Sequence, residues 1–197
     1  MLRAIEIWAQ LWLCSEDCNR IMDLLSTEGL AKRKRIVKNM HLTVYHGRRS
    51  MPGLLTRVEP IELVIPTAET RFMVMAPGGE NPRADLEPAN RKVGIRIQRR
   101  NPARAAIDEF RDRIMFYETK TVLGSRAPSN HNRNAFGARY FQPHMAVLRA
   151  GSGIDGDLTK VGSVFRTQIG ALRFDRFSVE ISIRKVPESS ESSLQSD

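Results

Sequence analysis

Two of the four histidines occupy matching positions in the two halves of the chain. His41 and His144 are separated by 103 residues in a chain of 197, and each begins a short apolar stretch, HLTVY and HMAVL. An imidazole has an ordinary pKa of about 6.5, so at neutral pH it can take up or release a proton. Two imidazoles on opposite sides of one phosphate could therefore divide the work of a general base and a general acid.

The residues beside each histidine suggest a phosphate site if both stretches are strands. Side chains alternate along a strand, so His41, Thr43 and Tyr45 are expected on one face and the apolar residues between them on the other. An imidazole and a hydroxyl side by side can both contact one phosphate. His144 and Ala146 would share a face in the same way, but Ala146 carries no hydroxyl. Because His-x-Thr is short and common, an ordinary exposed strand face is the alternative interpretation.

The basic charge is concentrated near these two stretches. The chain has 31 Lys and Arg against 22 Asp and Glu, a net charge of +9. Residues 29–58 contain eight basic and no acidic side chains, residues 119–154 contain five and none, and the rest holds 18 basic and 22 acidic side chains. This pattern favours a polyanion partner such as RNA or a nucleotide, with a solvated basic surface as the alternative.

The hydrophobic pattern predicts an α+β fold with antiparallel sheets. Strands are expected over 3–13, 36–46, 93–98, 144–149 and 172–186, with one or two more in 58–75, and helices over 15–29 and 102–123. Ser15 is expected to cap the first helix and Gly29 to end it, and Pro102 suits the first turn of the second. Residues 158–170 indicate neither state clearly. The order strand, helix, strand thus occurs twice. In each case the histidine lies in a strand that follows the helix.

The pair of motifs resembles those of the 2H phosphoesterase superfamily, which includes bacterial 2′-5′ RNA ligases and cyclic nucleotide phosphodiesterases. That family carries two His-x-Thr/Ser motifs, each on a strand and one in each lobe. Here the motifs read MHLTV at 40–44 and FQPHMAV at 141–147. The resemblance covers most of the chain up to about residue 186. It implies a bilobal, pseudo-two-fold arrangement of antiparallel sheets with helices packed outside and a central cleft.

The resemblance also implies a phosphoesterase acting on 2′,3′-cyclic or 2′-5′ phosphodiester linkages of nucleotides or RNA ends. His41 and His144 would be the catalytic residues, with no metal and no cofactor. Further substrate contacts are expected from Thr43, Tyr45, Arg126, Arg133, Arg139 and Tyr140. Ala146 departs from the family, which has Thr or Ser there, and losing one oxyanion donor typically costs about 10²–10³ in rate. Of the other two histidines, His46 is expected on the apolar side of its strand, and His131 lies in a polar loop.

Composition sets further expectations for the whole protein. Residues 1–186 are expected to form one bilobal domain that works as a monomer, and the Ser-rich residues 187–197 a disordered tail. No apolar run of about 18 residues is present, so no membrane span is expected. Cys14 and Cys18 are too few for a disulfide scaffold and suit the cytoplasm, and buried thiols are favoured over a metal pair.

Three functional hypotheses remain open from the sequence. The first is the metal-independent phosphoesterase. The second is an RNA- or nucleotide-binding module with a degenerate site, which Ala146 and the basic charge favour. The third is an unrelated basic α+β domain in which the histidines are incidental.

Overall fold

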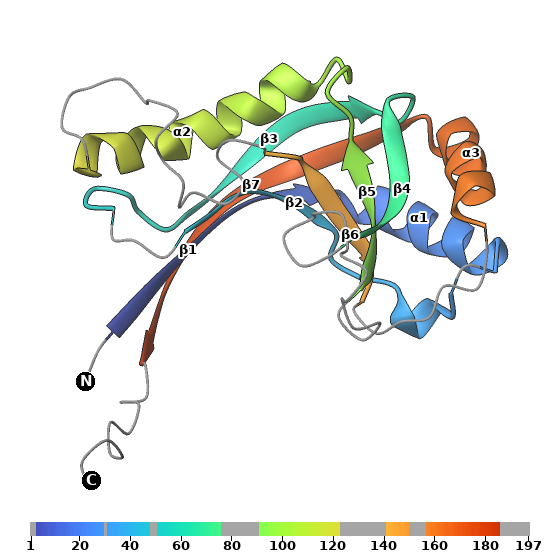
Figure 1. Ribbon diagram of the computed structural model, residues 1–197, viewed down its shortest axis with the longest axis horizontal. Coiled ribbons are helices and arrows are strands. Elements are labelled where there is room, and N and C mark those ends of the chain that lie inside the picture. Colours follow the sequence, from blue (N-terminus) through green and yellow to red (C-terminus); the bar gives the residue numbers. More distant parts are fainter. Residues whose placement is uncertain are drawn as a thin grey trace, which may run out of the picture.

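The computed structural model describes residues 3–29, 31–47, 51–75, 91–122, 141–149 and 157–185. Within them, seven strands and three α-helices confirm the predicted α+β class (Figure 1). The elements are β1 Arg3–Leu13, α1 Ser15–Thr27, the 3-10 helix η1 Arg33–Arg35, β2 His41–Gly47, β3 Arg57–Pro66, β4 Thr70–Met75, β5 Lys92–Ile97, α2 Arg104–Val122, β6 His144–Leu148, α3 Leu158–Ile169 and β7 Ala171–Lys185.

The seven strands form one sheet in the order β3-β7-β1-β2-β6-β5-β4, and each neighbouring pair is antiparallel. The junction in the middle is the shortest: β2 and β6 are paired through Leu42 and Met145 alone. It separates four strands on one side from three on the other. The two histidine strands are therefore neighbours at the centre of the sheet.

The sheet is strongly curved. Its two edge strands, β3 and β4, are joined by residues 67–69, a link that spans at most about 14 Å. The backbone N–H of Thr67 donates to Gly170 in one half, and that of Gln98 in the other half donates to Glu69. The segment 58–75 therefore does contain two strands, but they lie at opposite edges and approach each other only through the curvature (Figure 1).

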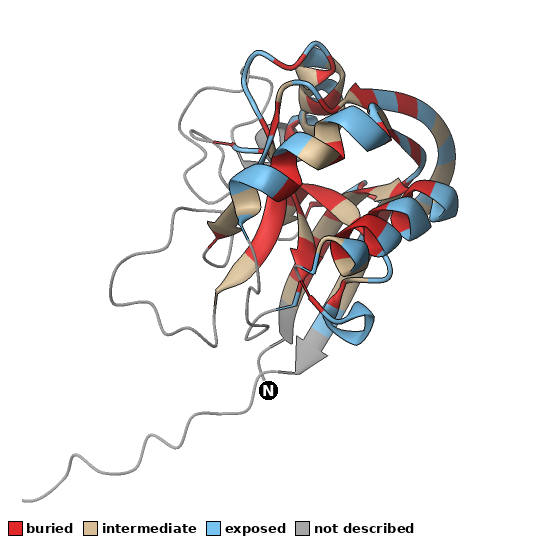
Figure 2. Cartoon of the chain, turned by 90° about the vertical axis from the view of Figure 1, so that its right-hand side faces the viewer, coloured by how far each residue is buried: buried red, intermediate tan, exposed pale blue. Residues whose placement is uncertain are grey.

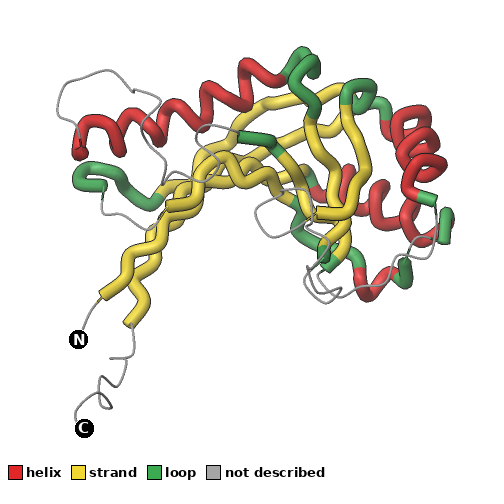
Figure 3. Tube along the Cα trace, in the orientation of Figure 1, coloured by secondary structure: helices red, strands yellow, loops and turns green. Residues whose placement is uncertain are grey.

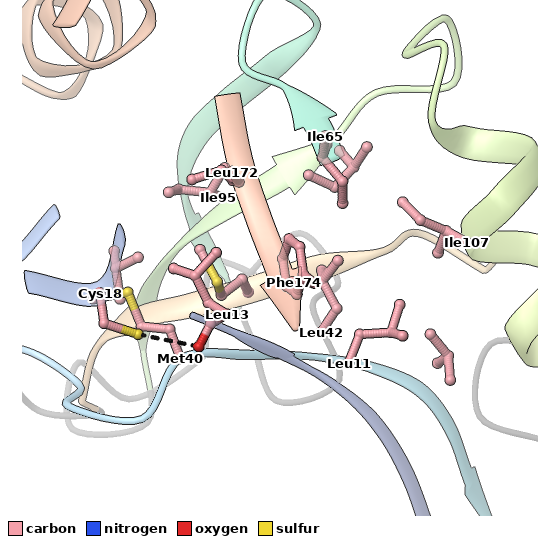
Figure 4. Close-up of a cluster of buried hydrophobic side chains, with 14 of the residues drawn as sticks. Leu11, Leu13, Cys18, Met40, Leu42, Ile65, Ile95, Ile107, Leu172 and Phe174 are labelled. Carbon is pink, nitrogen blue, oxygen red and sulfur yellow. Dashed lines mark hydrogen bonds between the residues drawn. The ribbon is translucent and has the colours of Figure 1, made fainter. Parts of the chain in front are cut away.

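One face of the sheet carries the hydrophobic core, and the helices pack on it. Leu11, Leu42 and Phe174 on this face are almost fully buried and lie among side chains from the helices, such as Cys18 and Ile107 (Figure 4). The helices show buried residues toward the sheet and exposed residues outward (Figure 2). Burying one such aliphatic or aromatic side chain contributes about 1.5–3 kcal/mol. The opposite face of the central strands is left for polar chemistry.

The helix ends agree only in part with the sequence predictions. Gly29 follows α1 with a φ of 68°, a left-handed conformation that glycine adopts without strain, as expected for a helix stop. Ser15 is already helical and Cys14 is the capping residue, so the prediction of Ser15 as the cap is wrong. Residues 158–169, which the sequence left open, form α3, whose first turn is capped by the Asp157 carboxylate accepting from the Thr159 N–H at 2.8 Å.

The chain ends of the described sheet lie together. β1 runs beside β7 along its whole length, pairing from Arg3 with Lys185 to Leu13 with Phe174 (Figure 3). This long ladder makes β1 a rigid support for its other neighbour, β2.

Candidate active site

β2 begins at the first histidine because the chain before it pairs with another part of the sheet. Ile36 forms an isolated bridge with Leu148, and the backbone N–H of Val37 donates to the carbonyl of Val147 at 2.8 Å. The chain then turns, and regular pairing resumes only at His41. The strand start predicted at Ile36 is therefore wrong, and His41 sits at the strand end, where a ring has room to contact a ligand.

The central pairing places the two histidines on one face. Leu42 lies opposite Met145, so the antiparallel register continued by one residue sets Thr43 opposite His144. Residues directly opposite share a face, and His41 shares it with Thr43. His41 and His144 are then diagonal neighbours, about 7–8 Å apart by strand geometry. We call this side of the central strands the histidine face.

Ala146 lies on the histidine face, opposite His41 in the same register. Its other neighbour is Gly94 of β5, which is paired with it directly. A Cβ on Gly94 would overlap the Met75 side chain and lie 2.7 Å from the Met145 carbonyl, so this position has to stay small. The methyl of Ala146 is only partly buried. Ala146 thus presents only a methyl group on this face, and the Met75 side chain fills the room above Gly94.

Both histidine rings are held by the same backbone contact. The Nδ1 of His41 lies 3.2 Å from the carbonyl oxygen of Asn39, and the Nδ1 of His144 lies 3.0 Å from that of Gln142. A carbonyl can only accept, so Nδ1 carries the proton in each ring. The lone pair of the neutral ring is then on Nε2, the atom that a general base uses.

The surroundings favour the neutral form of both rings. Burial lowers the pKa of His41 and of His144 below the ordinary value, because a charged ring loses hydration there. The hydrogen bond to the backbone carbonyl opposes this effect in each case, and Lys92 adds to it in each case. Arg96 and His41 lower the pKa of His144 further, so the two rings are close enough to interact electrostatically.

An aromatic side chain supports the first histidine from β1. Trp12 is paired with His41, and their ring centroids are 4.8 Å apart at an interplanar angle of 47°. The indole N–H of Trp12 donates to the hydroxyl of Ser178 at 2.7 Å, and the guanidinium of Arg176 lies 4.8 Å from the ring centroid. Gln10 lies next to Trp12 on this face, opposite Thr43. The Trp12 ring is therefore fixed from three sides.

A cation supports the second histidine from β5. Arg96 is paired with His144, and Lys92 lies on the same face of β5 two alternations away. Burial and the neighbouring Arg71 lower the pKa of Arg96 from its ordinary value. Cations that disfavour protonated histidines create a positive potential, and an anion bound between the rings would offset it.

The structure corrects the predicted faces of Tyr45 and His46. β2 has a bulge at Val44, so Tyr45 pairs with Ala9, whose side chain lies in the core. Tyr45 is 1% exposed and does not share the face of His41. The next residue, His46, stacks on Trp8 at 3.6 Å, and its Nε2 lies 2.9 Å from Glu6. Because Val44 is an extra residue in β2, Tyr45 lies on the core face and His46 on the opposite face, the reverse of the prediction.

Several predicted contacts lie outside the described residues. They are Arg126, Arg133, Arg139 and Tyr140. His131 and the Ser-rich residues 187–197 also lie outside the described residues. Their expected roles stay predictions. Thr43 is described and is 9% exposed at the base of the histidine face.

Two hollows are lined by residues next to the histidines, although neither His41 nor His144 lines them. One has a volume of about 1190 Å³ and includes Arg96 and Gln142, the neighbours of His144. The other has a volume of about 680 Å³ and includes Trp12 and Asn39, the neighbours of His41. Each hollow therefore includes the residue whose carbonyl holds one of the rings.

The described residues contain no group of three or more His, Cys, Asp or Glu side chains that could hold a metal ion. Cys18 is buried with its thiol 3.7 Å from the Leu13 carbonyl, and burial raises the pKa of both Cys18 and Cys14. Neutral thiols are poor metal ligands. Among the described helices, none is long and apolar enough to cross a membrane.

Sequence reasoning missed the residues that neighbouring strands contribute. Trp12 and Arg96 were part of predicted strands, whereas Lys92 lies one residue before the predicted start of its strand and is the first residue of β5. The alternation in KVGIRI places Lys92 and Arg96 on one face. Pairing of β1 with β2 and of β5 with β6 is what brings them to the histidines. The sequence therefore displays the alternation of side chains along each strand, but it does not display the register in which neighbouring strands pair.

Comparisons with known proteins assign no family to the chain. No protein-family model matches it, and no curated protein is similar to it in sequence.

Proposed function

We propose that this protein is a metal-independent phosphoesterase that acts on 2′,3′-cyclic or 2′-5′ phosphodiester linkages of nucleotides or RNA ends. The observation that carries the proposal is the histidine pair: His41 and His144 lie diagonally on neighbouring strands, and each donates Nδ1–H to the carbonyl two residues before it. Such a pair has one Nε2 for each side of a phosphate.

The strand order supports a pseudo-two-fold relation between two lobes, as in the 2H phosphoesterase superfamily. β1, α1 and β2 precede and include one histidine, and β5, α2 and β6 do the same for the other. A two-fold axis between β2 and β6 would exchange His41 with His144 and Trp12 with Arg96. The cleft of this proposal is the histidine face with its two flanking hollows.

The reaction would need one proton transfer on each side of the phosphorus. A neutral ring takes a proton from the attacking water as its oxygen bonds to phosphorus. The bond from phosphorus to the leaving oxygen breaks, and the protonated second ring gives its proton to that oxygen. Lys92 and Arg96 are near enough to the rings to stabilise the negative charge that grows on the phosphate.

We assign the base role in hydrolysis to His144 and the acid role to His41. Arg96 lies directly opposite His144 and disfavours its protonated form. His41 instead packs against the Trp12 ring, whose π-face favours a nearby cation. The roles would exchange in the reverse reaction.

A second candidate is a module that binds RNA or nucleotides without turnover. Ala146 favours it, because a methyl group stands where the superfamily has a phosphate-binding hydroxyl. In both candidates the protein is a monomer of the cytoplasm that needs no cofactor.

The test is turnover of a 2′,3′-cyclic mononucleotide in the presence of EDTA. The control is the double variant His41→Asn/His144→Asn, in which each Asn amide can still donate to the backbone carbonyl but no atom replaces Nε2. We expect wild-type turnover that EDTA leaves unchanged and the double variant abolishes. Binding without turnover would favour the second candidate, and loss of activity on chelation would overturn metal independence.

A further inference from the structure

The hollow beside His144 has an excess of positive charge. It is lined by five arginines, Arg71, Arg96, Arg99, Arg104 and Arg111, against two aspartates, Asp108 and Asp112. These arginines come from β4, from β5 and the turn after it, and from the first turns of α2. None of them lies in the two basic windows of the sequence, so the fold assembles this cluster from a region with little net charge.

Two of these arginines are held in fixed orientations. Arg104 binds both carboxylate oxygens of Asp108 at 3.0 Å and donates to the carbonyl of Phe141 at 2.8 Å. The guanidinium of Arg111 lies 4.8 Å from the centroid of the Phe141 ring. Phe141 comes three residues before His144, so the wall of the hollow is continuous with the histidine strand.

The other arginines include a pair of like charges. Arg71 and Arg96 are directly opposite each other on β4 and β5, an arrangement that destabilises a sheet unless an anion offsets it. Arg71 and Arg99 are exposed, so both can reach a ligand. Arg96 is one strand from His144, roughly 5 Å, and Arg71 is two strands away, roughly 10 Å.

We propose that this hollow binds a second phosphate of the same substrate, and that the substrate is an oligoribonucleotide end rather than a mononucleotide. The inference rests on the proposed function, because it takes the reacting phosphate to lie between His41 and His144. The hollow includes Arg96, one strand away from His144, and is also lined by the exposed Arg71 and Arg99. Its volume of about 1190 Å³ exceeds what a single phosphate needs and accommodates a further nucleotide.

The experiment compares a trinucleotide that ends in a 2′,3′-cyclic phosphate with a 2′,3′-cyclic mononucleotide, with and without a 5′-phosphate. In the wild type we expect kcat/KM for the trinucleotide to exceed that for either mononucleotide by about 10- to 100-fold, the scale of hydrogen bonds to a charged group. In the double variant Arg71→Gln/Arg99→Gln this ratio should fall toward one. The control Lys34→Gln removes an exposed charge of η1 and should preserve the ratio.

A wild-type ratio near one would overturn the inference, as would a high ratio that the arginine variant preserves. A mononucleotide with a 5′-phosphate that reacts as fast as the trinucleotide would also overturn it, since the second phosphate would then be terminal. If the wild type turns over none of these substrates, the proposed function fails. The inference about the second phosphate is then tested separately by a binding measurement. Fluorescence anisotropy with a labelled trinucleotide should show that the arginine variant has a shallower salt dependence, by a slope of about 0.7 for each phosphate that it no longer neutralises. An unchanged slope would overturn the inference.

Discussion

The two hollows near the histidines differ in chemistry although each includes the residue whose carbonyl holds one of the rings. The hollow beside His144 is lined by five arginines, whereas the one beside His41 has Trp12 and mixed charges that include Asp175 and Arg176. The rings themselves are held by the same backbone hydrogen bond, at 3.0 Å and 3.2 Å. Rings held in the same way therefore have different chemical surroundings. The neighbours from the adjoining strands differ, and on this difference we base the proposed assignment of acid and base.

A second difference concerns the hydroxyl beside each ring. Thr43 follows His41 by two residues and carries one, whereas Ala146 follows His144 by two residues and carries a methyl group. Because the register sets Thr43 opposite His144, Thr43 shares the histidine face with both rings. The two histidine motifs therefore carry one hydroxyl between them.

The largest expected effect separates the roles of the two histidines. His41→Asn and His144→Asn should each lower kcat by about 10²–10⁴-fold, and the double variant should lose little more than either single variant, since both act on one transition state. The measurement is steady-state kinetics, with circular dichroism to verify folding.

The asymmetry can be tested with an activated substrate. A nucleotide p-nitrophenyl ester needs no proton on its leaving oxygen, so it should restore activity to His41→Asn much more than to His144→Asn. The reverse rescue would contradict the roles assigned from Trp12 and Arg96. Near-normal activity of either single variant on the cyclic substrate would contradict the two-histidine mechanism.

An intermediate effect is expected from adding the missing hydroxyl. Ala146→Thr should raise the rate by about 10- to 100-fold if the new hydroxyl bonds a phosphate oxygen, the scale of about 1.5–3 kcal/mol for a hydrogen bond to a charged group. Ala146→Val is the matched control, because it has the same shape without the hydroxyl. Equal rates for the two variants would show that the hydroxyl has no role. Tighter binding without faster turnover of Ala146→Thr would favour the binding module.

The smallest expected effects are shifts in the histidine pKa values, measured by NMR titration. Both pKa values should lie below the ordinary histidine value in the protein without ligand. The contribution of the neutral rings to folding stability is then fully present above the ordinary pKa. It is lost as the pH falls through the two lowered pKa values. Lys92→Gln should raise both, whereas Arg96→Gln should raise that of His144 alone. Inorganic phosphate should raise both, because an anion stabilises the imidazolium. If Arg96→Gln raised the pKa values of His41 and His144 equally, the proposed difference between the surroundings of the two rings would be contradicted.

Much of the fold follows from local patterns that the sequence displays directly. The alternation of 172–186 and the apolar spacing around Ile107 and Ile114 predicted β7 and α2 to within a few residues. Residues 158–170 could not be assigned, because α3 buries a short stripe against Phe72 of β4, which is distant in sequence. The face of Tyr45 was mispredicted because strict alternation does not allow for a bulge.

The sequence by itself determined the residue types at the centre of the site: two histidines at matched strand positions, Thr43 beside one and Ala146 beside the other. Only the tertiary structure decided which side chains surround them. Trp12 and Arg96 reach the two rings through strand pairings that join residues 29 and 48 positions apart, and Arg71 joins the basic hollow through β4 at the sheet edge. The physical reason is that alternation is a local property of the backbone. Register between strands instead depends on the packing of the whole core, which no short window of sequence contains.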